Sequence, residues 1–343
     1  MTHPLRILTW HVHGSYLLYL SQCPHEFFLP VKSGRPHGYG GRSGPFPWPD
    51  NVYEVDAADL RSLTFDCILF QTSQHFLEDQ YDLLTRDQRR LPRIYLEHDP
   101  PQAHPTNTRH IVNDPDVLLV HVTHYNRLMW DCGRTPTRVV EHGVFVSEQA
   151  RYSGELSRGI AVVNHLARRG RRLGEDVFRE MRRRAPIDLV GMAAEESDGL
   201  GEVPFDQLHV LLGRYRFYFH PVRYTSLGLA ACEAMMIGMP IVGLATTELA
   251  TVITNGAEGY VSAKFDDLAD AMSALLDDRA LATRMGAQAR QLAMERFGID
   301  RFVADWCDVF ATVTGRRDSP RPARERRSMV DHALKMGPLG AAV

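Results

Sequence analysis

The residues best placed to bind a charged ligand lie in the segment 220–242. A short loop with Ser226 and Gly228 follows an aromatic run, and a helix of small residues begins after that glycine. Glycine lets a ligand approach the backbone closely, and the unpaired N–H groups of a first helical turn bind anions. Gly238 and Pro240 are the residue types that end a helix. This order of strand, loop, helix and strand predicts a diphosphate seat at the carboxyl edge of a parallel sheet.

A single carboxylate, Glu233, lies one to two turns into this otherwise apolar helix. Beside a phosphate seat, a carboxylate can accept hydrogen bonds from both hydroxyls of a ribose. The spacing alone is equally compatible with an exposed carboxylate that binds nothing.

Four arginines follow the first expected strand of the second half of the chain: Arg168, Arg169, Arg171 and Arg172. Guanidinium groups at a strand-to-helix junction are suited to bidentate recognition of phosphate. A solvated basic turn is the alternative. Because this junction and Gly228 belong to the same expected sheet, we favour phosphate binding.

Composition narrows the class of protein. The chain has 343 residues, 44% hydrophobic and 24% charged, which predicts a globular protein of two domains. A net charge of -3 argues against a nucleic-acid partner held by bulk charge. Five widely spaced cysteines without a C-x-x-C indicate reduced thiols, and the sequence shows neither a signal segment nor a long apolar span. We therefore expect a cytoplasmic protein.

Short apolar runs alternate with helical patterns, which predicts an α/β fold of two Rossmann-like domains. The expected strands are 6–11, 26–31, 66–70, 93–97, 117–121 and 138–141 in the first half, and 160–163, 187–191, 215–220 and 240–244 in the second. The expected helices are 76–84, 125–132, 174–184, 205–214, 228–237, 266–276 and 279–297.

The expected domains are 1–150 and 151–298. A C-terminal helix over 299–314 can cross back to the first domain. The loop 33–50 is dense in Gly, Pro, Arg and aromatic residues. A loop this long in a compact domain is expected to be functional or disordered. The basic tail 315–343 is expected to be disordered, with a peripheral contact to anionic lipid at the inner face of the membrane as the alternative.

The segment 225–242 resembles the donor-binding signature of GT-B glycosyltransferases of the retaining family 4 type, the glycosyl transferases group 1. The residues in register are Leu227–Leu229, Glu233–Met235, Gly238 and Pro240–Val242, and the run 248–261 resembles a later stretch of the family. The resemblance covers about residues 215–297. It implies two Rossmann-like domains with parallel sheets facing a central cleft, and metal-independent sugar transfer with retention from a nucleotide-sugar donor.

The resemblance also implies roles for individual residues. The catalytic residues are expected to be His98 and Asp99, and the acceptor-side loop His13, Gly14 and Ser15. No cofactor and no metal are implied. The implied donor-binding residues are His165, Arg168, Arg169, Arg171, Thr225, Ser226, Leu227, Gly228, Leu229, Glu233 and Glu248.

One position departs from the family pattern. Thr225 stands where the family has a glutamate that contacts the transferred sugar, and a neutral hydroxyl makes a weaker hydrogen bond than a carboxylate. Three functions therefore stay open: a transferase acting on a glycan, lipid or small-molecule acceptor, a GT-B epimerase or phosphorylase, and an inactive subunit that binds a sugar nucleotide or a partner. The histidines show no zinc spacing, and no G-x-S-x-G elbow indicates a hydrolase. The sequence leaves the oligomeric state open.

Overall fold

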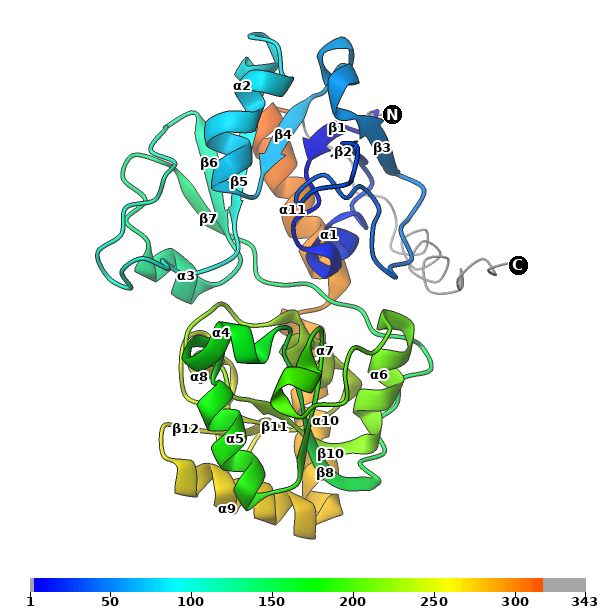
Figure 1. Ribbon diagram of the computed structural model, residues 1–343, viewed down its shortest axis with the longest axis vertical. Helices are drawn as coiled ribbons and strands as arrows, with labels where there is room; N and C mark the ends of the chain where they lie inside the picture. Colours follow the sequence, from blue (N-terminus) through cyan, green and yellow to red (C-terminus); the bar gives the residue numbers. More distant parts are fainter. Residues whose placement is uncertain (1–2, 317–343) are drawn as a thin grey trace. The chain divides into compact units, whose positions relative to one another are not determined.

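The computed structural model describes residues 3–316, and the basic tail from residue 317 onward lies outside the described residues. Contacts divide the chain after Gly143 into two compact units (Figure 1). The first unit contains the residues up to Gly143 together with helix α11 (Ile299–Thr314), and the second contains Val144–Gly298. Each unit holds one parallel β-sheet with helices around it, so the α/β fold expected from the sequence is confirmed.

The first unit is built on a seven-stranded sheet in the order β3-β2-β1-β4-β5-β6-β7, with every neighbouring pair parallel. Its strands are β1 (Arg6–Thr9), β2 (Glu26–Val31), β3 (Val52–Asp56), β4 (Cys67–Phe70), β5 (Arg93–Glu97), β6 (Val117–His121) and β7 (Thr137–Val139). Its helices are α1 (Gly14–Leu20), α2 (Gln80–Leu83), α3 (His124–Met129) and α11, with shorter helical turns at Ala57–Ser62, His75–Asp79 and Gln88–Arg90.

Helix α11 belongs to the core of the first unit. Its Trp306 is fully buried and donates from Nε1 to the hydroxyl oxygen of Tyr16 on α1, at 3.2 Å. The ring of Phe310 lies 5.4 Å from that of His25, at the start of β2. The chain therefore returns to its first unit after the second unit ends, and α11 (orange in Figure 1) lies beside α1 and the strands.

The second unit is built on a five-stranded parallel sheet in the order β12-β11-β10-β8-β9. Its strands are β8 (Leu156–Val162), β9 (Ile187–Val190), β10 (Tyr215–His220), β11 (Ile241–Leu244) and β12 (Gly259–Ser262). Its helices are α4 (Leu166–Leu173), α5 (Glu175–Arg184), α6 (Phe205–Arg214), α7 (Leu229–Ile237), α8 (Leu249–Val252), α9 (Phe265–Asp277) and α10 (Arg279–Arg296), with a helical turn at Ala194–Ser197.

Some elements differ from the sequence expectation. The helix expected over 76–84 is a π-helical turn, His75–Asp79, that continues into the four-residue α2. Strand β3 was not expected, because its side chains are mostly exposed and it lies at the sheet edge. Helix α4 was not expected either, because its sequence is dominated by arginines and it is kinked at Gly170. None of the helices formed by residues 3–316 combines the length and the apolar character that a membrane crossing requires.

Candidate active site

The carboxyl ends of strands β8, β10 and β11 bring three loops to one edge of the second sheet. These strands are neighbours and run in the same direction, so the residues that follow them lie close together. Thr246, after β11, donates from Oγ1 to the carbonyl oxygen of Val222, after β10, at 2.8 Å. The backbone N–H groups of Arg223 and Tyr224 both donate to the carbonyl oxygen of Arg172 on α4, at 3.1 Å. The loops that carry the predicted donor-binding residues therefore form one surface.

Gly228 caps the N-terminus of α7 and leaves open space in front of it. Its φ of -70° and ψ of 141° are accessible to any residue, and no side chain caps the helix. A Cβ atom at this position would have one atom of the protein within 4 Å, Cε1 of His220 at 3.9 Å. Neither the backbone nor the packing requires a glycine here. An opening beside uncapped helical N–H groups is the geometry of an anion seat.

A network of charges braces the loop that leads to Gly228. Arg223 forms a bidentate ion pair with Asp176 on α5, with Nη2 at 2.7 Å from Oδ2. Arg171 on α4 contacts the same carboxylate at 2.6 Å. Arg223, and more weakly Arg171, lower the pKa of Asp176 below its usual value. The loop is thus fixed to the α4–α5 corner, and Arg171 has an internal partner.

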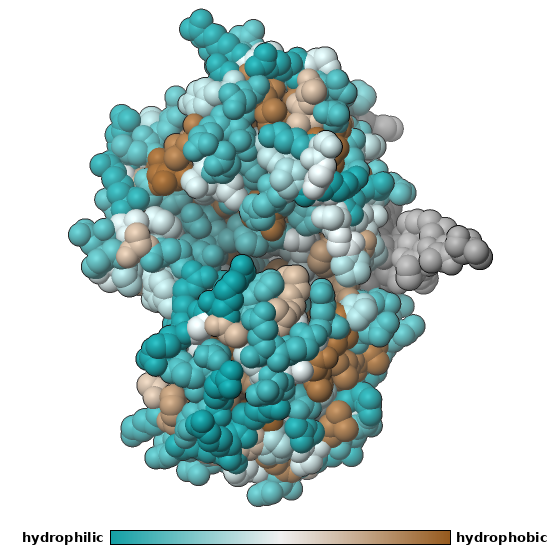
Figure 2. Space-filling model, viewed as in Figure 1, coloured by the Kyte–Doolittle hydropathy of each residue, from teal (hydrophilic) through white to brown (hydrophobic). Residues whose placement is uncertain are grey.

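The other basic residues of the predicted cluster lie on and before α4. His165 caps the helix in the left-handed region, at φ 53°, and its N–H donates to the carbonyl oxygen of Met192 at 2.7 Å. A non-glycine residue in this region is uncommon, and such positions concentrate at functional sites. Arg168 is exposed and Arg169 half-buried in the first turn. Figure 2 shows hydrophilic side chains gathered over α4 and α5.

Both predicted carboxylates of the donor side are buried. Glu233 is 4% exposed, and its Oε2 lies 3.6 Å from Nε2 of His209 on α6. Glu248 is 2% exposed and accepts a 2.8 Å hydrogen bond from Nη2 of Arg296 on α10. Glu233 is therefore not a solvated surface carboxylate. The charge of Glu248 is balanced by an arginine of its own unit.

The remaining predicted donor-side residues flank Gly228. Leu227 is buried and anchors the loop, while Thr225, Ser226 and Leu229 are partly exposed beside the seat. Partial exposure is compatible with contact to a ligand. It leaves Thr225 in a position to offer its hydroxyl group.

His220 was missed by the sequence reasoning. It ends β10, is 4% exposed, and its Nδ1 has no hydrogen-bond partner among residues 3–316. Burial lowers its pKa to about 4, so the ring is neutral at pH 7. Its place directly before the Gly228 loop was the signal that pointed to it.

In the first unit, His98 lies at the carboxyl end of β5 and meets residues from two neighbouring strands. Its Nε2 is 3.0 Å from Oε1 of Gln71, which follows β4. Its ring is 4.2 Å from that of His13, after β1, and 4.8 Å from that of Tyr16. Burial, with smaller contributions from His13 and His142, holds the pKa of His98 well below its usual value. The structure therefore brings predicted His98 and His13 together.

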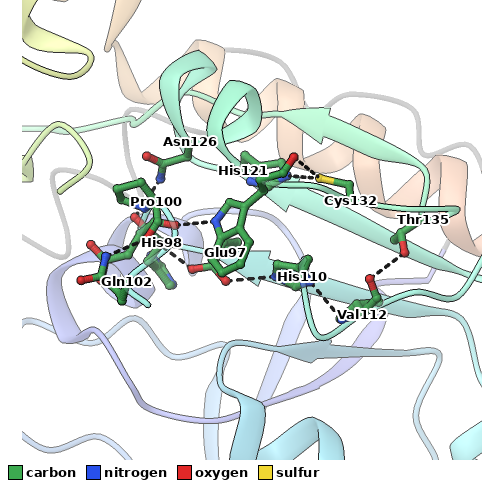
Figure 3. A network of polar contacts seen from close by, with 12 residues as sticks. Glu97, His98, Pro100, Gln102, His110, Val112, His121, Asn126, Cys132 and Thr135 are labelled. Carbon is green, nitrogen blue, oxygen red and sulfur yellow. Dashed lines mark hydrogen bonds and ion pairs between the residues drawn. The ribbon is translucent and has the colours of Figure 1, made fainter. Parts of the chain in front are cut away.

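The backbone around His98 and Asp99 is held by surrounding side chains (Figure 3). The carbonyl oxygen of His98 accepts from Nδ2 of Asn126 at 3.0 Å, and that of Asp99 accepts from Nε1 of Trp130 at 2.9 Å. Glu97 accepts from the N–H of Asp99 at 3.0 Å and contacts His110 at 3.1 Å. Glu97 is thus committed to positioning the strand end.

The loop that was expected on the acceptor side leads into α1, and its glycine has a packing explanation. A Cβ at Gly14 would lie 2.4 Å from Cε2 of Phe46, so the aromatic ring fills the space above it. Ser15 is partly exposed and His13 is exposed. Among residues 3–316, no three His, Cys, Asp or Glu side chains are grouped as a metal site requires.

Part of the second unit matches a known protein family. Residues 194–292 match the family model described as glycosyl transferases group 1. The chain is 40% identical over 106 residues to a D-inositol 3-phosphate glycosyltransferase of Xylanimonas cellulosilytica, a match covering 30% of this chain and 24% of that protein. The chain spans about a quarter or less of the length of the curated relatives it matches.

Two solved structures show the same fold over nearly the whole chain. Sucrose-phosphate synthase from Thermosynechococcus elongatus aligns with a TM-score of 0.67 at 14% identity, covering 92% of this chain and 100% of that one. HepE from Anabaena, solved in complex with UDP-glucose, aligns with a TM-score of 0.65 at 12% identity, covering 90% and 100%. The chain therefore has the GT-B fold, and its resemblance to glycosyl transferases group 1 is confirmed.

Proposed function

We propose that this chain is a glycosyltransferase that moves a sugar from a nucleotide-sugar donor held by the second unit to an acceptor at the first. The observation that carries the proposal is the open seat at Gly228. Gly228 precedes helix α7, whose first N–H groups donate no hydrogen bond to a capping side chain. Neither its backbone angles nor its packing requires a glycine, and it lies inside the segment that matches the glycosyltransferase family model. The solved structure of HepE with UDP-glucose supports a nucleotide sugar as the donor class.

Some of the predicted residues of the second unit then have a chemical task. The N–H groups of the first turn of α7 and the guanidinium groups of Arg168 and Arg169 bind the diphosphate and stabilise its charge as it leaves. Positive groups at this position do the work that a cation would do, so we propose a metal-independent reaction. Glu233 accepts hydrogen bonds from the ribose hydroxyls. Its burial beside His209 fixes the direction of its carboxylate.

In the first unit, we propose that His98 forms a hydrogen bond to a sugar hydroxyl. The ring is neutral, half-buried and oriented by Gln71, so its second nitrogen can accept a hydrogen bond from a sugar hydroxyl. Asp99 follows on a backbone pinned by Trp130 and is the carboxylate we assign to the acceptor hydroxyl. We propose that the transferred sugar retains its anomeric configuration. Proton NMR of the product, recorded early in the reaction, reports this configuration directly.

A binding experiment tests the donor assignment. We expect one nucleoside diphosphate or nucleotide sugar from a panel to raise the unfolding temperature of the full chain, since a ligand at 100 times its Kd stabilises the folded state by about 2.7 kcal/mol. Replacing Arg169 with alanine should weaken this binding by about 1.5–3 kcal/mol. Arg183→Ala is the matched control, because Arg183 lies on α5 and pairs with Glu180. Equal binding by wild type and Arg169→Ala would remove Arg169 from the site.

Thr225 supports a second candidate, a subunit that binds a sugar nucleotide without turning it over. The position is partly exposed beside the seat, yet it offers a hydroxyl where the family signature has a carboxylate. Such a protein would bind the diphosphate as the transferase does. Only a measurement of turnover separates the two.

A further inference from the structure

The segment 33–50 is held in place by a network of its own. Glu54 on β3 receives two hydrogen bonds from Arg35, at 2.9 and 3.0 Å, and a third from the N–H of Arg42, at 2.6 Å. Gly38 and Gly40 form bridges to His11 and Val31. A long loop that is fixed at several points in this way can present side chains in a defined geometry.

This segment places two aromatic rings beside the end of β1. The ring centroids of Phe46 and Trp48 are 5.8 Å apart, and Trp48 lies edge-on to His11 at 5.4 Å. Phe46 also covers Gly14 at the start of α1. Both aromatic side chains keep part of their surface exposed, and prolines before, between and after them restrict the backbone.

Polar groups surround these rings. Nδ1 of His11 is 2.5 Å from the carbonyl oxygen of Gly41 and so carries the hydrogen, because a carbonyl can only accept. The other ring nitrogen, Nε2, is therefore the acceptor, and it lies 3.0 Å from the position of a Cβ on Gly14. Ser43 Oγ lies 3.2 Å from His11 Nδ1 on an exposed stretch that also carries Arg42.

We propose that His11, Ser43, Phe46 and Trp48 form a subsite for a pyranose ring of a saccharide acceptor. A pyranose presents an apolar C–H face to an aromatic ring and a rim of hydroxyls to donors and acceptors, which is the combination this surface offers. An acyl chain would require a continuous apolar surface, and the exposed Arg42 and Ser43 interrupt it. The subsite rests on the proposed transferase function, because it names the class of its acceptor.

The test uses the full chain on an array of immobilised oligosaccharides ending in gluco-, galacto-, manno- or N-acetylhexosamine units. We expect binding to at least one oligosaccharide, and a loss of about tenfold or more in affinity for both Phe46→Ala and Trp48→Ala. Trp48→Phe, which keeps an aromatic ring, should retain most of the binding. Tyr53→Ala is the matched control, because Tyr53 is an exposed aromatic on β3 that stacks on Phe28.

Nucleoside diphosphate affinity, measured on the same proteins, distinguishes the possible failures. A urea-unfolding transition like that of the wild type shows that Phe46→Ala and Trp48→Ala keep a folded first unit, and a loss of glycan binding with unchanged diphosphate affinity then supports the subsite. Diphosphate binding without glycan binding by the wild type, or equal glycan binding by all variants, overturns the subsite alone. Glycan binding that depends on Trp48 in a chain that binds no diphosphate supports the subsite and contradicts the proposed donor.

Discussion

Nε2 of His98 lies 3.0 Å from Oε1 of Gln71, and this contact decides which nitrogen of the histidine carries the hydrogen. The amide nitrogen of Gln71 donates to the carbonyl oxygen of Trp10 at 2.8 Å and to Oγ1 of Thr9 at 3.0 Å. A carbonyl can only accept, so the orientation of the amide is set and its Oε1 must accept. Nε2 of His98 is therefore the donor, and Nδ1 is the acceptor that the proposed function assigns to a substrate hydroxyl.

Replacing Gln71 with leucine tests this positioning role. Without its partner the ring of His98 is free to change orientation or tautomer, and we expect turnover at saturating donor to fall by about one to two orders of magnitude. Nucleoside diphosphate affinity, measured by calorimetry, should not change. Gln74→Leu is the control, because Gln74 is exposed and bonds to Glu78. If the two variants have equal turnover, Gln71 does not position His98.

The open space at Gly228 predicts an unusual alanine variant. Gly228→Ala should leave the free energy of unfolding unchanged or raise it by up to about 1 kcal/mol, since its backbone suits alanine. The same methyl group should weaken diphosphate binding by about tenfold or more, because it occupies the place where the ligand approaches. Calorimetry and urea unfolding measure the two effects.

Gly14→Ala is the matched contrast to Gly228→Ala, because Gly14 has no open space beside it. Its methyl group would collide with Phe46, so the free energy of unfolding should fall by about 1–3 kcal/mol. If Gly228→Ala kept full diphosphate affinity, the seat at α7 would have to be abandoned.

Glu233 is tested by a change that keeps its shape. Glu233→Gln retains the packing of the buried side chain and removes its charge. We expect nucleoside diphosphate affinity to fall by about 1.5–3 kcal/mol, the range for a hydrogen bond to a charged group. The binding free energy of a nucleoside without phosphate groups should fall by a similar amount, while inorganic diphosphate should bind as before. A variant that only unfolds more easily, with all affinities intact, would make Glu233 a structural residue.

Buried histidines predict a protein that loses stability in mild acid. Burial lowers the pKa of His75 and of His220 to about 4 and that of His121 to about 3. In the unfolded chain these groups titrate near 6.5, so between about pH 6.5 and 4 the unfolded state binds more protons. The free energy of unfolding should therefore fall as the pH is lowered through this window, by up to about 1.4 kcal/mol per pH unit for each group.

Urea unfolding at pH 7.5, 6.5 and 5.5 measures this dependence. His220→Leu should make it shallower, because the variant has one buried titrating group fewer. His104→Gln, at an exposed position, should leave it unchanged. A stability that is constant over this range would contradict the buried, neutral state of these rings.

Much of the fold was predictable because its strands are short apolar runs with clear ends. Strands β2, β5, β6 and β10 and helix α6 have the bounds expected from the sequence. Strand β12 and helix α8 were not predicted, because each has only four residues and so shows no clear periodic pattern.

The geometry of the candidate site was predictable where it depends on the order of residues along the chain, as at the helix start after Gly228. It was not predictable where it depends on contacts across the fold. The pairing of Arg171 and Arg223 on Asp176, and the burial of Glu248 against Arg296, follow from how α4, α5 and α10 pack. Gln71 carries no motif, and its role appears only when β4 and β5 lie side by side.

Release of nucleoside diphosphate from a panel of nucleotide sugars is the decisive test of whether this chain transfers a sugar. Oligosaccharides serve as acceptors, and wild type is compared with Thr225→Glu. We predict release with at least one donor, dependent on acceptor, and a loss of that activity in Thr225→Glu, because a new carboxylate would enter a site shaped around a neutral hydroxyl. If neither protein releases nucleoside diphosphate with any donor or acceptor, although both still bind it, the proposed transferase function is contradicted. The inactive subunit that binds a sugar nucleotide is then the remaining function.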